Sequence, residues 1–345
     1  MLTDTRLSPE LYFDTIFAYQ RSAALKTAVE IDFFTAIDEG ARTLPEIARA
    51  CGAPERSVRI LADYLTTLGF LTKSDQTYAL TPDSAAFLSK RSPAYLGGTV
   101  EFLQAPELVA PFASLTETVR RGTPAANMAA DENVAWVRFA RAMVPMMMPA
   151  AQAIAGLLEG LPRPAGGTVR VLDIAAGHGV FGIVVAQRIP EAEIVAVDWP
   201  SVLEVATENA RKMGVAARHR TLAGDAFTVD YGAGFDVALV TNFLHHFDRA
   251  ANVAFLKKVA AALKPGGRAV VLEFVPNEDR VTPPMAARFG LTMLATTGAG
   301  EAYTFGQLSG MLEEAGFRDA ALHPLEGPQA LVVAATEQGL ATAVG

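Results

Sequence analysis

The sequence predicts an α/β protein in which a Rossmann-like sheet of seven strands follows a smaller, mostly helical domain. Three observations support this fold class. From residue 169 onward, short apolar runs alternate with helical patterns, which is typical of a doubly wound sheet. The first run, Val169–Ile174, ends in a turn of small residues, and an apolar helical segment follows it. Residues 11–80 instead combine helical periodicity with one short hairpin.

Composition narrows the class of protein. The chain has 345 residues, of which 51% are hydrophobic, so it can form two domains with cores of their own. Its net charge of −8 argues against non-specific binding of nucleic acid. Cys51 is the only cysteine, which excludes a disulfide within the chain, and residues 1–10 carry no secretory pattern. We therefore expect a cytoplasmic protein.

The segment Leu11–Ile37 is apolar on several faces, whereas a surface helix of a monomer shows one apolar stripe. Burial against a second copy of the chain is the simplest explanation, so we expect a homodimer formed through this domain. A pair of internal helices in a monomer is the alternative.

Residues 42–80 have the pattern of a winged helix. Thr43 and Glu46 have the spacing of a capping box, Glu55–Leu68 is apolar at helical spacing, and two short strands flank the turn at residues 73–76. Winged helices often bind DNA. However, residues 1–100 hold 10 Lys or Arg against 12 Asp or Glu, a net charge of −2. A structural, dimer-forming role is therefore favoured.

The segment Ala142–Leu158 has no charged residue, yet it is short for a membrane span and contains Pro145 and Pro149. We interpret it as a kinked, buried helix and expect no membrane association. The preceding segment, Glu132–Val144, is also predicted to be helical, and a run of methionines follows it. Methionine thioethers adapt to flat apolar surfaces, so this region is a candidate wall for an aromatic ligand.

The seven strands are predicted from short apolar runs that are bounded by turn residues. They are Val169–Ile174, Glu193–Val197, a strand near Arg218–Leu222, Phe235–Thr241, Arg268–Val275, Phe317–Pro324 and Ala330–Thr336. The fifth should follow a turn at residues 264–267, and a helix at Thr304–Ala315 should precede the last two. A tight turn, Leu325–Gln329, joins that final pair, so the last strand should be antiparallel, a feature that dinucleotide-binding folds lack.

The turn after the first strand predicts a nucleotide pocket. Residues 177–182 match the G-x-G-x-x-G pattern, which is a weak signal for a dinucleotide by itself. Asp173 lies inside the strand, and its carboxylate would repel a pyrophosphate. It suits a ligand with a cationic amino acid group, such as S-adenosylmethionine (SAM). A dinucleotide, or a βα turn without a ligand, remains an alternative.

Ligands of open α/β sheets lie beyond the carboxyl ends of the strands. Asp198 ends the second strand and suits ribose hydroxyls, and Asp225 with Phe227 ends the third and suits adenine. The expected cofactor-binding residues are Asp173, Gly177, Gly179, Asp198, Trp199, Gly224, Asp225, Ala226, Phe227, Thr241 and Asn242.

His245 follows the fourth strand and is a candidate general base, because imidazole accepts a proton near pH 7. Glu273 and Glu301 are candidates to orient it and to stabilise its protonated form. We expect no metal, since adjacent histidines point apart and cannot easily share an ion. The candidate substrate-contacting residues are Phe139, Met143, Met147, His246, Phe289 and Met293.

Four motifs resemble those of SAM-dependent O-methyltransferases of the caffeate, acetylserotonin and bacterial polyketide-tailoring type. Residues 171–179 look like the first motif of that family, with alanines at 175 and 176 in place of the usual glycines. Asp198-Trp199-Pro200 is similar to its ribose-binding Asp-Leu-Pro, and residues 224–227 are similar to its adenine motif. Leu244–Phe247 stands where the family has Leu-His-Asp-Trp.

The resemblance covers nearly the whole chain and implies roles for particular residues. The catalytic base of the family falls on His245, and its two supporting glutamates fall on Glu273 and Glu301. Two features depart from the plant pattern, namely His246 in place of aspartate and the loss of a Lys-Glu-Arg sequence around Glu301.

The resemblance thus implies a class I methyltransferase with three parts. Residues 1–105 would form a winged-helix dimerisation domain, residues 106–165 a helical connector that contributes to the substrate pocket, and residues 166–345 the SAM-binding domain. The expected reaction moves a methyl group from SAM to a hydroxyl of a small, largely apolar, aromatic metabolite. A C- or N-methyltransferase on the same scaffold, or a SAM-sensing winged-helix regulator, remains an alternative.

Overall fold

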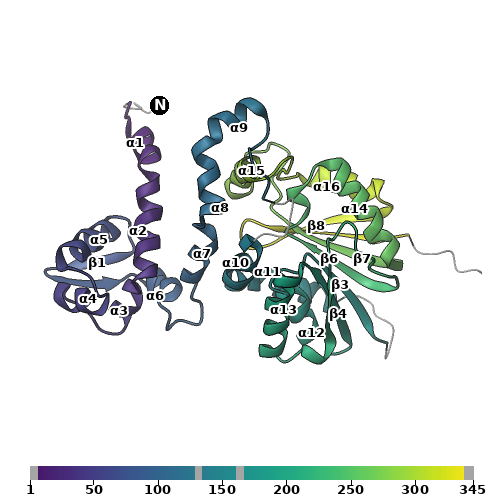
Figure 1. The fold of residues 1–345 in the computed structure, drawn as a ribbon, viewed down its shortest axis with the longest axis horizontal. Coiled ribbons are helices and arrows are strands. Elements are labelled where there is room, and N and C mark those ends of the chain that lie inside the picture. The colour runs from purple at the N-terminus through teal and green to yellow at the C-terminus, as the bar shows by residue number, and fades with distance from the viewer. Residues whose placement is uncertain (1–6, 129–133, 161–166, 338–345) are drawn as a thin grey trace, which may run out of the picture. The chain divides into compact units, whose positions relative to one another are not determined.

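The computed structural model describes residues 7–128, 134–160 and 167–337. Its chain divides into two units, Met1–Ala105 and Pro106–Gly345 (Figure 1). The segment that we expected as a separate connector, residues 106–165, falls in the second unit together with the large sheet.

The first unit consists of short helices and one hairpin. Its elements are α1 (Glu10–Ile16), α2 (Ala18–Glu30), α3 (Phe33–Asp38), α4 (Leu44–Ala50), α5 (Glu55–Thr67), β1 (Leu71–Ser74), β2 (Thr77–Leu80), α6 (Pro82–Leu88), η1 (Gly97–Thr99) and α7 (Val100–Leu103). The predicted capping box at α4 is present, and backbone N–H groups of Thr43 and Arg42 lower the pKa of Glu46 to about 2. Helices α4 and α5 followed by the antiparallel β1–β2 hairpin match the arrangement expected for a winged helix.

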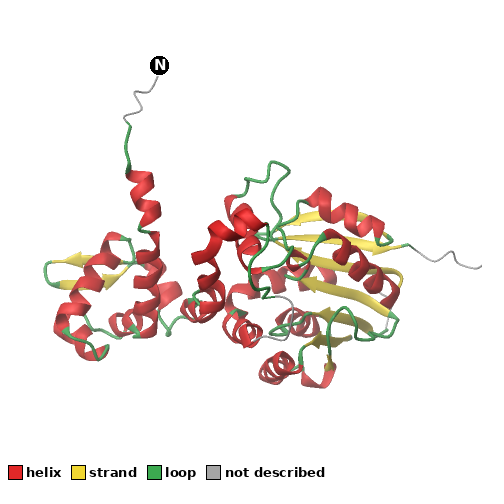
Figure 2. Ribbon diagram, turned by 45° about the horizontal axis from the view of Figure 1, so that its top comes forward, coloured by secondary structure: helices red, strands yellow, loops and turns green. Residues whose placement is uncertain are grey.

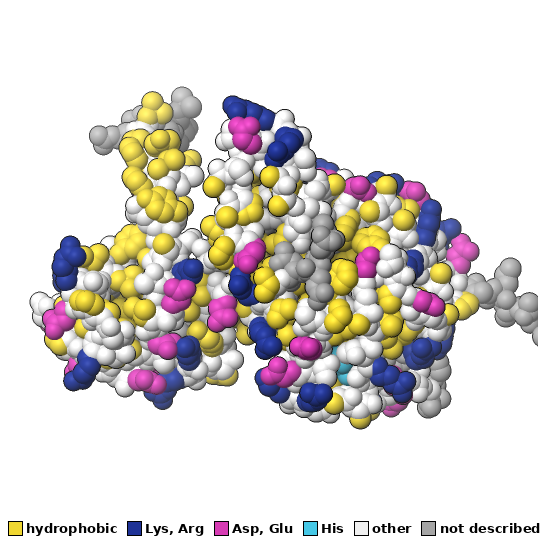
Figure 3. All heavy atoms as spheres, viewed as in Figure 1, with side chains coloured by type: hydrophobic (Ala, Val, Ile, Leu, Met, Phe, Trp, Pro, Cys, Tyr) yellow, Lys and Arg dark blue, Asp and Glu magenta, His cyan; other side chains and the backbone are white. Residues whose placement is uncertain are grey.

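The apolar N-terminal segment divides into a buried part and an exposed part. Phe33, Phe34 and Ile37 of α3 lie fully inside the core of this unit. In contrast, α1 buries no residue, and Figure 3 shows apolar side chains along the surface of α1 and α2. The exposed large side chains of this region are Leu7, Leu11, Tyr12, Phe13, Ile16, Phe17 and Tyr19. Within a single chain, the segment is therefore not buried on all its faces.

The second unit is built on the large sheet that Figure 2 shows in yellow. Its seven strands follow the order β5-β4-β3-β6-β7-β9-β8. The strands are β3 (Val169–Ile174), β4 (Ala192–Asp198), β5 (His219–Ala223), β6 (Phe235–Thr241), β7 (Leu263–Glu273), β8 (Phe317–Pro324) and β9 (Ala330–Thr336). Strands β3 to β7 pair in parallel, and β9 is antiparallel to both β7 and β8. The mixed sheet and the antiparallel last strand confirm the fold class.

Most of the predicted strand bounds agree with these strands, and β7 is the exception. The structure begins it at Leu263, so residues 264–267, which were expected to form a turn, belong to the strand. The pairing with β6 is irregular there, because the register shifts between Phe235 and Val237. The strand also ends at Glu273 rather than at Val275, which leaves the Glu273 side chain at the carboxyl end of the sheet.

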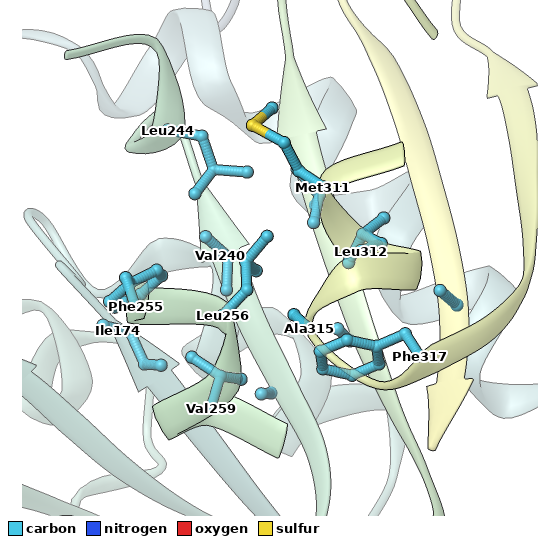
Figure 4. Close-up of a cluster of buried hydrophobic side chains, with 14 of the residues drawn as sticks. Ile174, Val240, Leu244, Phe255, Leu256, Val259, Met311, Leu312, Ala315 and Phe317 are labelled. Atoms are coloured by element: carbon cyan, nitrogen blue, oxygen red, sulfur yellow. The ribbon is translucent and has the colours of Figure 1, made fainter. Parts of the chain in front are cut away.

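Helices cover both faces of the sheet. The chain first adds β4 and β5 on one side of β3 and then β6 and β7 on the other side. Because each crossover between parallel strands is right-handed, the two sets of helices lie on opposite faces. Side chains of α14 and α16 pack with Ile174, Val240 and Leu244 in the main core (Figure 4). The helices and 3-10 turns after β3 are α12 (Val180–Arg188), α13 (Pro200–Lys212), η3 (Ala216–Arg218), η4 (Leu244–His246), α14 (Arg249–Ala262), α15 (Pro284–Thr296) and α16 (Phe305–Glu314).

The segment before β3 is also helical. It contains α8 (Pro106–Val109), η2 (Ala110–Ser114), α9 (Leu115–Arg121), α10 (Val134–Ala142) and α11 (Val144–Glu159). The predicted kink is a break at Met143, where α10 and α11 meet at 70°, whereas Pro149 lies within α11 without ending it. Glu132, the predicted start of α10, lies outside the described residues. Of the described helices, none is by itself long and apolar enough to cross a membrane, and only the bent pair α10–α11 meets the length and composition criteria together.

Candidate active site

Asp173 lies near the end of β3, fully buried beneath the glycine turn. Its Oδ2 accepts a hydrogen bond from the N–H of Gly182 at 3.0 Å, whereas Oδ1 has no partner among the described residues. Burial, reinforced by the charge of Asp198, raises the pKa of Asp173 to about 8. An added Cβ on Gly182 would lie 2.8 Å from Oδ2, so glycine is required for this close approach of helix and carboxylate. A buried carboxylate oxygen without a donor is a site for a cationic or hydrogen-bonding ligand.

The turn after β3 contains three residues with positive φ, namely Ala175 (52°), Gly177 (56°) and Gly179 (71°). Ala175 occupies the left-handed region at a cost of about 1 kcal/mol or more, because its Cβ crowds the following carbonyl. The N–H of Gly177 donates to Oδ2 of Asp198 at 2.8 Å, and the N–H of Trp199 donates to Oδ1 at 2.7 Å. The carboxylate that was expected to bind ribose is thus fixed against the glycine turn.

His178 is a variable position of the glycine pattern and was not predicted to have a role. In the structure it is almost completely buried within the turn. Its Nδ1 accepts the N–H of Val180 at 3.1 Å, so the ring proton is on Nε2. Burial lowers the pKa of His178 to about 3, which keeps the ring neutral. The ring stacks on Phe139 with centroids 5.6 Å apart. Phe139, expected to contact substrate, therefore lies beside the glycine turn.

The residues expected at the adenine side lie at the end of β5. Gly224 has a φ of 154°, and an added Cβ would lie 2.9 Å from Val229. The side chain of Asp225 accepts the N–H of Phe227 at 3.0 Å. Phe227 packs edge-on against Phe247 at 4.8 Å, within a cluster of aromatic rings. Ala226 lies between Asp225 and Phe227 in the sequence. Trp199 packs against a separate apolar cluster, which is formed by residues of α10 and α13.

His245 and Glu273 form a buried pair at the ends of β6 and β7, with 4% and 2% of each residue exposed. Nδ1 of His245 lies 2.5 Å from Oε2 of Glu273. The other oxygen, Oε1, accepts the backbone N–H groups of Phe243 at 3.1 Å and of His245 at 3.3 Å. Asn242 has a φ of 54°, which turns the chain sharply after β6 and directs these donors at Glu273. Phe289 of α15 stands edge-on to His245, with ring centroids 4.7 Å apart.

The structure places Glu301 differently from the expectation that both glutamates hold the imidazole. Its carboxylate pairs with Arg280, a residue that no sequence pattern had indicated, and 43% of the Glu301 side chain is exposed. Glu301 contacts His245 through its backbone N–H, which donates to the carbonyl of His245 at 2.9 Å. Gly300 packs against the same carbonyl, where an added Cβ would lie 2.2 Å from the oxygen. Residues 300 and 301 therefore contact His245 through their backbone, and the Glu301 carboxylate does not take part in this contact.

His246 lies beside His245, with ring centroids 4.2 Å apart, and Trp136 of α10 stands edge-on to it with ring centroids 5.3 Å apart. Its Nδ1 is buried and has no partner among the described residues, although part of the residue is exposed. Loss of hydration, together with His245, lowers the pKa of His246 well below its ordinary value. A neutral imidazole offers one donor and one acceptor to a neighbouring ligand.

The methionines expected at the substrate wall, Met143, Met147 and Met293, are all buried. Thr241 is buried as well, at the end of β6. The Asn242 amide, expected to contact the cofactor, instead donates to Sδ of Met147 at 3.6 Å and accepts from Nε2 of Gln329. Among the residues that the structure describes, no group of three or more His, Cys, Asp or Glu side chains could hold a metal ion.

A doubly wound sheet with an antiparallel last strand, a glycine turn after its first strand and acidic residues at successive strand ends is the architecture of a class I SAM-dependent methyltransferase. Comparison of the sequence with protein families specifies this further. Residues 165–318 match the O-methyltransferase domain, and residues 13–90 match the O-methyltransferase dimerisation domain. The chain belongs to the O-methyltransferase family, whose members use SAM as the methyl donor.

Similar proteins span almost the whole chain. A Nostoc punctiforme PCC 73102 protein of known structure, designated a candidate O-methyltransferase, is 49% identical, with a TM-score of 0.92 and coverage of 96% of this chain and 100% of that chain. The 3-hydroxy-5-methyl-1-naphthoate 3-O-methyltransferase of Streptomyces sahachiroi is 28% identical over 316 residues, 89% of each chain. The tetracenomycin polyketide synthesis 8-O-methyl transferase TcmO of Streptomyces glaucescens is 27% identical over 324 residues, 92% of this chain and 93% of its own.

The residues at the glycine turn fit SAM. The unpartnered Oδ1 of Asp173 suits the ammonium group of the cofactor, which a pyrophosphate-containing cofactor would lack. A Cβ added at Gly177 would lie 3.4 Å from the ring of Phe139, so any larger side chain would fill the gap between the turn and this ring. Glycine keeps that gap open.

Proposed function

We propose that this protein transfers a methyl group from SAM to a hydroxyl of a small, largely apolar, aromatic metabolite, and that His245 is the general base. The buried contact between Nδ1 of His245 and Oε2 of Glu273 carries this proposal. A phenol near neutral pH must lose its proton to become a good nucleophile, and a positioned imidazole is suited to accept it.

The cofactor half of the site lies at the ends of β3, β4 and β5. When bound, SAM supplies an electrophilic methyl group on its sulfonium. Asp173 would bind the ammonium group, Asp198 the ribose hydroxyls, and Asp225 with Phe227 the adenine. The remaining expected contacts, Gly177, Gly179, Trp199, Gly224, Ala226 and Thr241, shape the pocket through their backbone or their packing.

Glu273 determines which ring atom of His245 is the base. An ionised carboxylate only accepts hydrogen bonds, so the contact at 2.5 Å places a proton on Nδ1 and leaves the lone pair on Nε2. Nε2 then takes the proton of the acceptor hydroxyl. The positive charge that develops on the ring is stabilised by the carboxylate next to it.

The acceptor half of the site is apolar, which supports an aromatic substrate. Phe289 stands against His245 and stacks on Phe274 at 3.9 Å, and Met293 lies on the same helix. His246 is the polar side chain next to the base. We assign Phe289, Met293, Met143, Met147 and His246 to the acceptor wall, and Phe139 to the boundary with the cofactor. The names of the two Streptomyces relatives support this substrate class, because one is a hydroxynaphthoate O-methyltransferase and the other an O-methyl transferase of polyketide synthesis.

The protein works as a homodimer in this proposal. The dimerisation domain covers residues 13–90, and the apolar side chains of α1 and α2 lie exposed in the single chain. A contiguous exposed apolar surface of this kind is typical of an interface.

The test is a screen of SAM consumption across phenols and hydroxyquinones, followed by His245→Ala on the best substrate. Removal of a general base lowers kcat by about 10²–10⁴-fold. Binding of S-adenosylhomocysteine (SAH), measured by calorimetry, should change by less than about twofold, because His245 is not assigned to the cofactor half. His323→Ala, at an exposed histidine of β8, is the matched control. A kcat within a few-fold of the parent would contradict the base and favour C- or N-methylation.

A further inference from the structure

The amide of Asn242 is held from two sides by residues distant in the sequence. Gln329, in the turn between β8 and β9, donates through Nε2 to Oδ1 of Asn242. Nδ2 of Asn242 in turn donates to Sδ of Met147, on α11, at 3.6 Å. Three elements of the second unit therefore meet at one side chain, and each end of the amide has a partner of the right polarity.

Asn242 is also the residue that directs the loop carrying the base. Its N–H donates to the carbonyl of Leu272 at 2.8 Å, which ties it to β7. Its positive φ then turns the chain so that the next N–H groups, from Phe243 and His245, reach Glu273. A shift of Asn242 would move both the donors to Glu273 and the imidazole that Glu273 orients.

The turn at residues 325–329 reaches this loop across the end of one strand. In the sheet, β7 lies between β6 and β9, and Glu273 of β7 pairs with Ala330 of β9. Gln329 directly precedes Ala330 and contacts Asn242 beyond the end of β6. Its side chain therefore passes the end of β7, where Glu273 begins its contact with the base.

We propose that Gln329 is a positioning residue for His245, acting through Asn242. This inference rests on the proposed function, because it requires His245 to be the base. It also gives Asn242 a different role from the cofactor contact that the sequence suggested. Because the Met147 thioether can only accept, it takes the NH₂ group of Asn242, and Oδ1 of Asn242 is left to face the N–H donor of Gln329. Loss of the Gln329 contact should therefore also change the surroundings of the Met147 thioether.

The experiment compares Gln329→Met, which keeps the length of the side chain and removes the donor, with Glu326→Ala, an exposed residue of the same turn. Gln329→Met should lower kcat by about tenfold to a hundredfold, the effect expected from a small displacement of a catalytic group. The SAH dissociation constant should change by less than about twofold. The Met147 resonance in spectra of protein labelled with [methyl-¹³C]methionine, assigned with Met147→Leu, should shift. Glu326→Ala should leave all three quantities at parent values.

A double variant separates this proposal from the proposed function. If Gln329 acts through His245, Gln329→Met should change kcat by less than about twofold in a His245→Ala background. An equal loss in both backgrounds, or a parent-like kcat for Gln329→Met, would overturn the positioning role while leaving His245 as base. A parent-like kcat for His245→Ala would instead overturn the base and this inference with it. Should Gln329→Met fail to fold, as judged by circular dichroism, Gln329→Ala is measured with the same readouts.

Discussion

Nδ1 of His245 lies 2.5 Å from Oε2 of Glu273, and the other oxygen of that carboxylate accepts two backbone N–H groups from the loop that carries the histidine. The carboxylate therefore holds the ring and the backbone of its partner together. This arrangement leaves the imidazole little freedom to rotate or to change its tautomer, so the predictions begin with Glu273.

Glu273→Gln should lower kcat by about a hundredfold, because an amide does not enforce the tautomer that leaves Nε2 free. It should also lower the free energy of unfolding by about 1–3 kcal/mol, since one amide cannot accept all three donors. Steady-state kinetics and urea unfolding measure the two effects. A variant with parent kcat would show that Glu273 does not orient the base.

Glu301→Gln should have a much smaller effect than Glu273→Gln. Its carboxylate is partly exposed and pairs with Arg280, and such surface pairs contribute about 0–1 kcal/mol to stability. Arg280→Gln should behave in the same way in both assays. If Glu301→Gln instead lost as much activity as Glu273→Gln, the Glu301 carboxylate would have to turn from Arg280 to His245 during the reaction.

Gly300→Ala should displace the backbone of His245 without removing any polar group. The new Cβ would lie 2.2 Å from the carbonyl oxygen of His245, so the backbone on one side must move. We expect a loss of about 1–3 kcal/mol in the free energy of unfolding, together with a lower kcat. Gly310→Ala is the matched control, because an added Cβ there meets nothing within 4 Å and alanine favours the helix. Equal stability of the two variants would contradict the close packing at Gly300.

Asp173→Asn should change both the stability and its dependence on pH. The pKa of Asp173 is raised from 3.8 to about 8 in the folded protein, so the folded state binds the extra proton between these values. Its contribution is therefore present at low pH and is lost as the pH rises through about 8. The unliganded parent should lose Tm as the pH rises from about 7 to about 8. His178, whose pKa falls from 6.5 in the unfolded chain to about 3 on folding, has the opposite effect, but it acts mainly below about pH 7, where the unfolded chain protonates this ring.

Asp173→Asn should remove most of that decline in Tm. It should also weaken SAH binding by about tenfold to a hundredfold, the range for a lost charge-assisted hydrogen bond. Thermal unfolding at a series of pH values and calorimetry with SAH provide the measurements. A parallel pH dependence of parent and variant would show that Asp173 stays ionised.

Ile16→Glu should convert the proposed dimer into monomers, because it places a charge among the exposed apolar side chains of α1. Light scattering after size-exclusion chromatography determines the mass. Ser57→Glu adds the same charge at an exposed position of α5 and should leave the dimer intact. A dimeric Ile16→Glu protein would place the interface elsewhere.

The sequence predicted those parts of the molecule that depend on local signals. The capping box of Thr43 and Glu46, the strand bounds other than those of β7, and the order of acidic residues at strand ends all follow from short-range patterns. The pairing of His245 with Glu273 followed because parallel strands end at the same edge of a sheet. In each case, neighbouring residues or a general rule of topology determined the outcome.

Contacts between distant loops were not predictable in this way. The Glu301 carboxylate pairs with Arg280 rather than with His245, and Gln329 contacts Asn242, which lies 87 positions away in the chain. No periodicity or motif encodes such pairs, since they depend on how two turns fold back over the sheet. The kink of residues 142–158 was predicted from its prolines, but the bend lies at Met143, and Pro149 is accommodated within α11.

The position of β9 has a consequence for the synthesis of the chain. This strand comes last in the described sequence, yet it lies between β7 and β8, and Gln329 and Ala330 stand at its beginning. When a nascent chain has left the ribosome only as far as β8, the edge of β7 is still unpaired. The loop after β6, which carries Asn242 and His245, then lacks the contact from Gln329. Premature termination within the last strand would therefore yield a product that retains the glycine turn for the cofactor but has an unfinished sheet beside the base. Translation must proceed through β9 before the two halves of the site are complete.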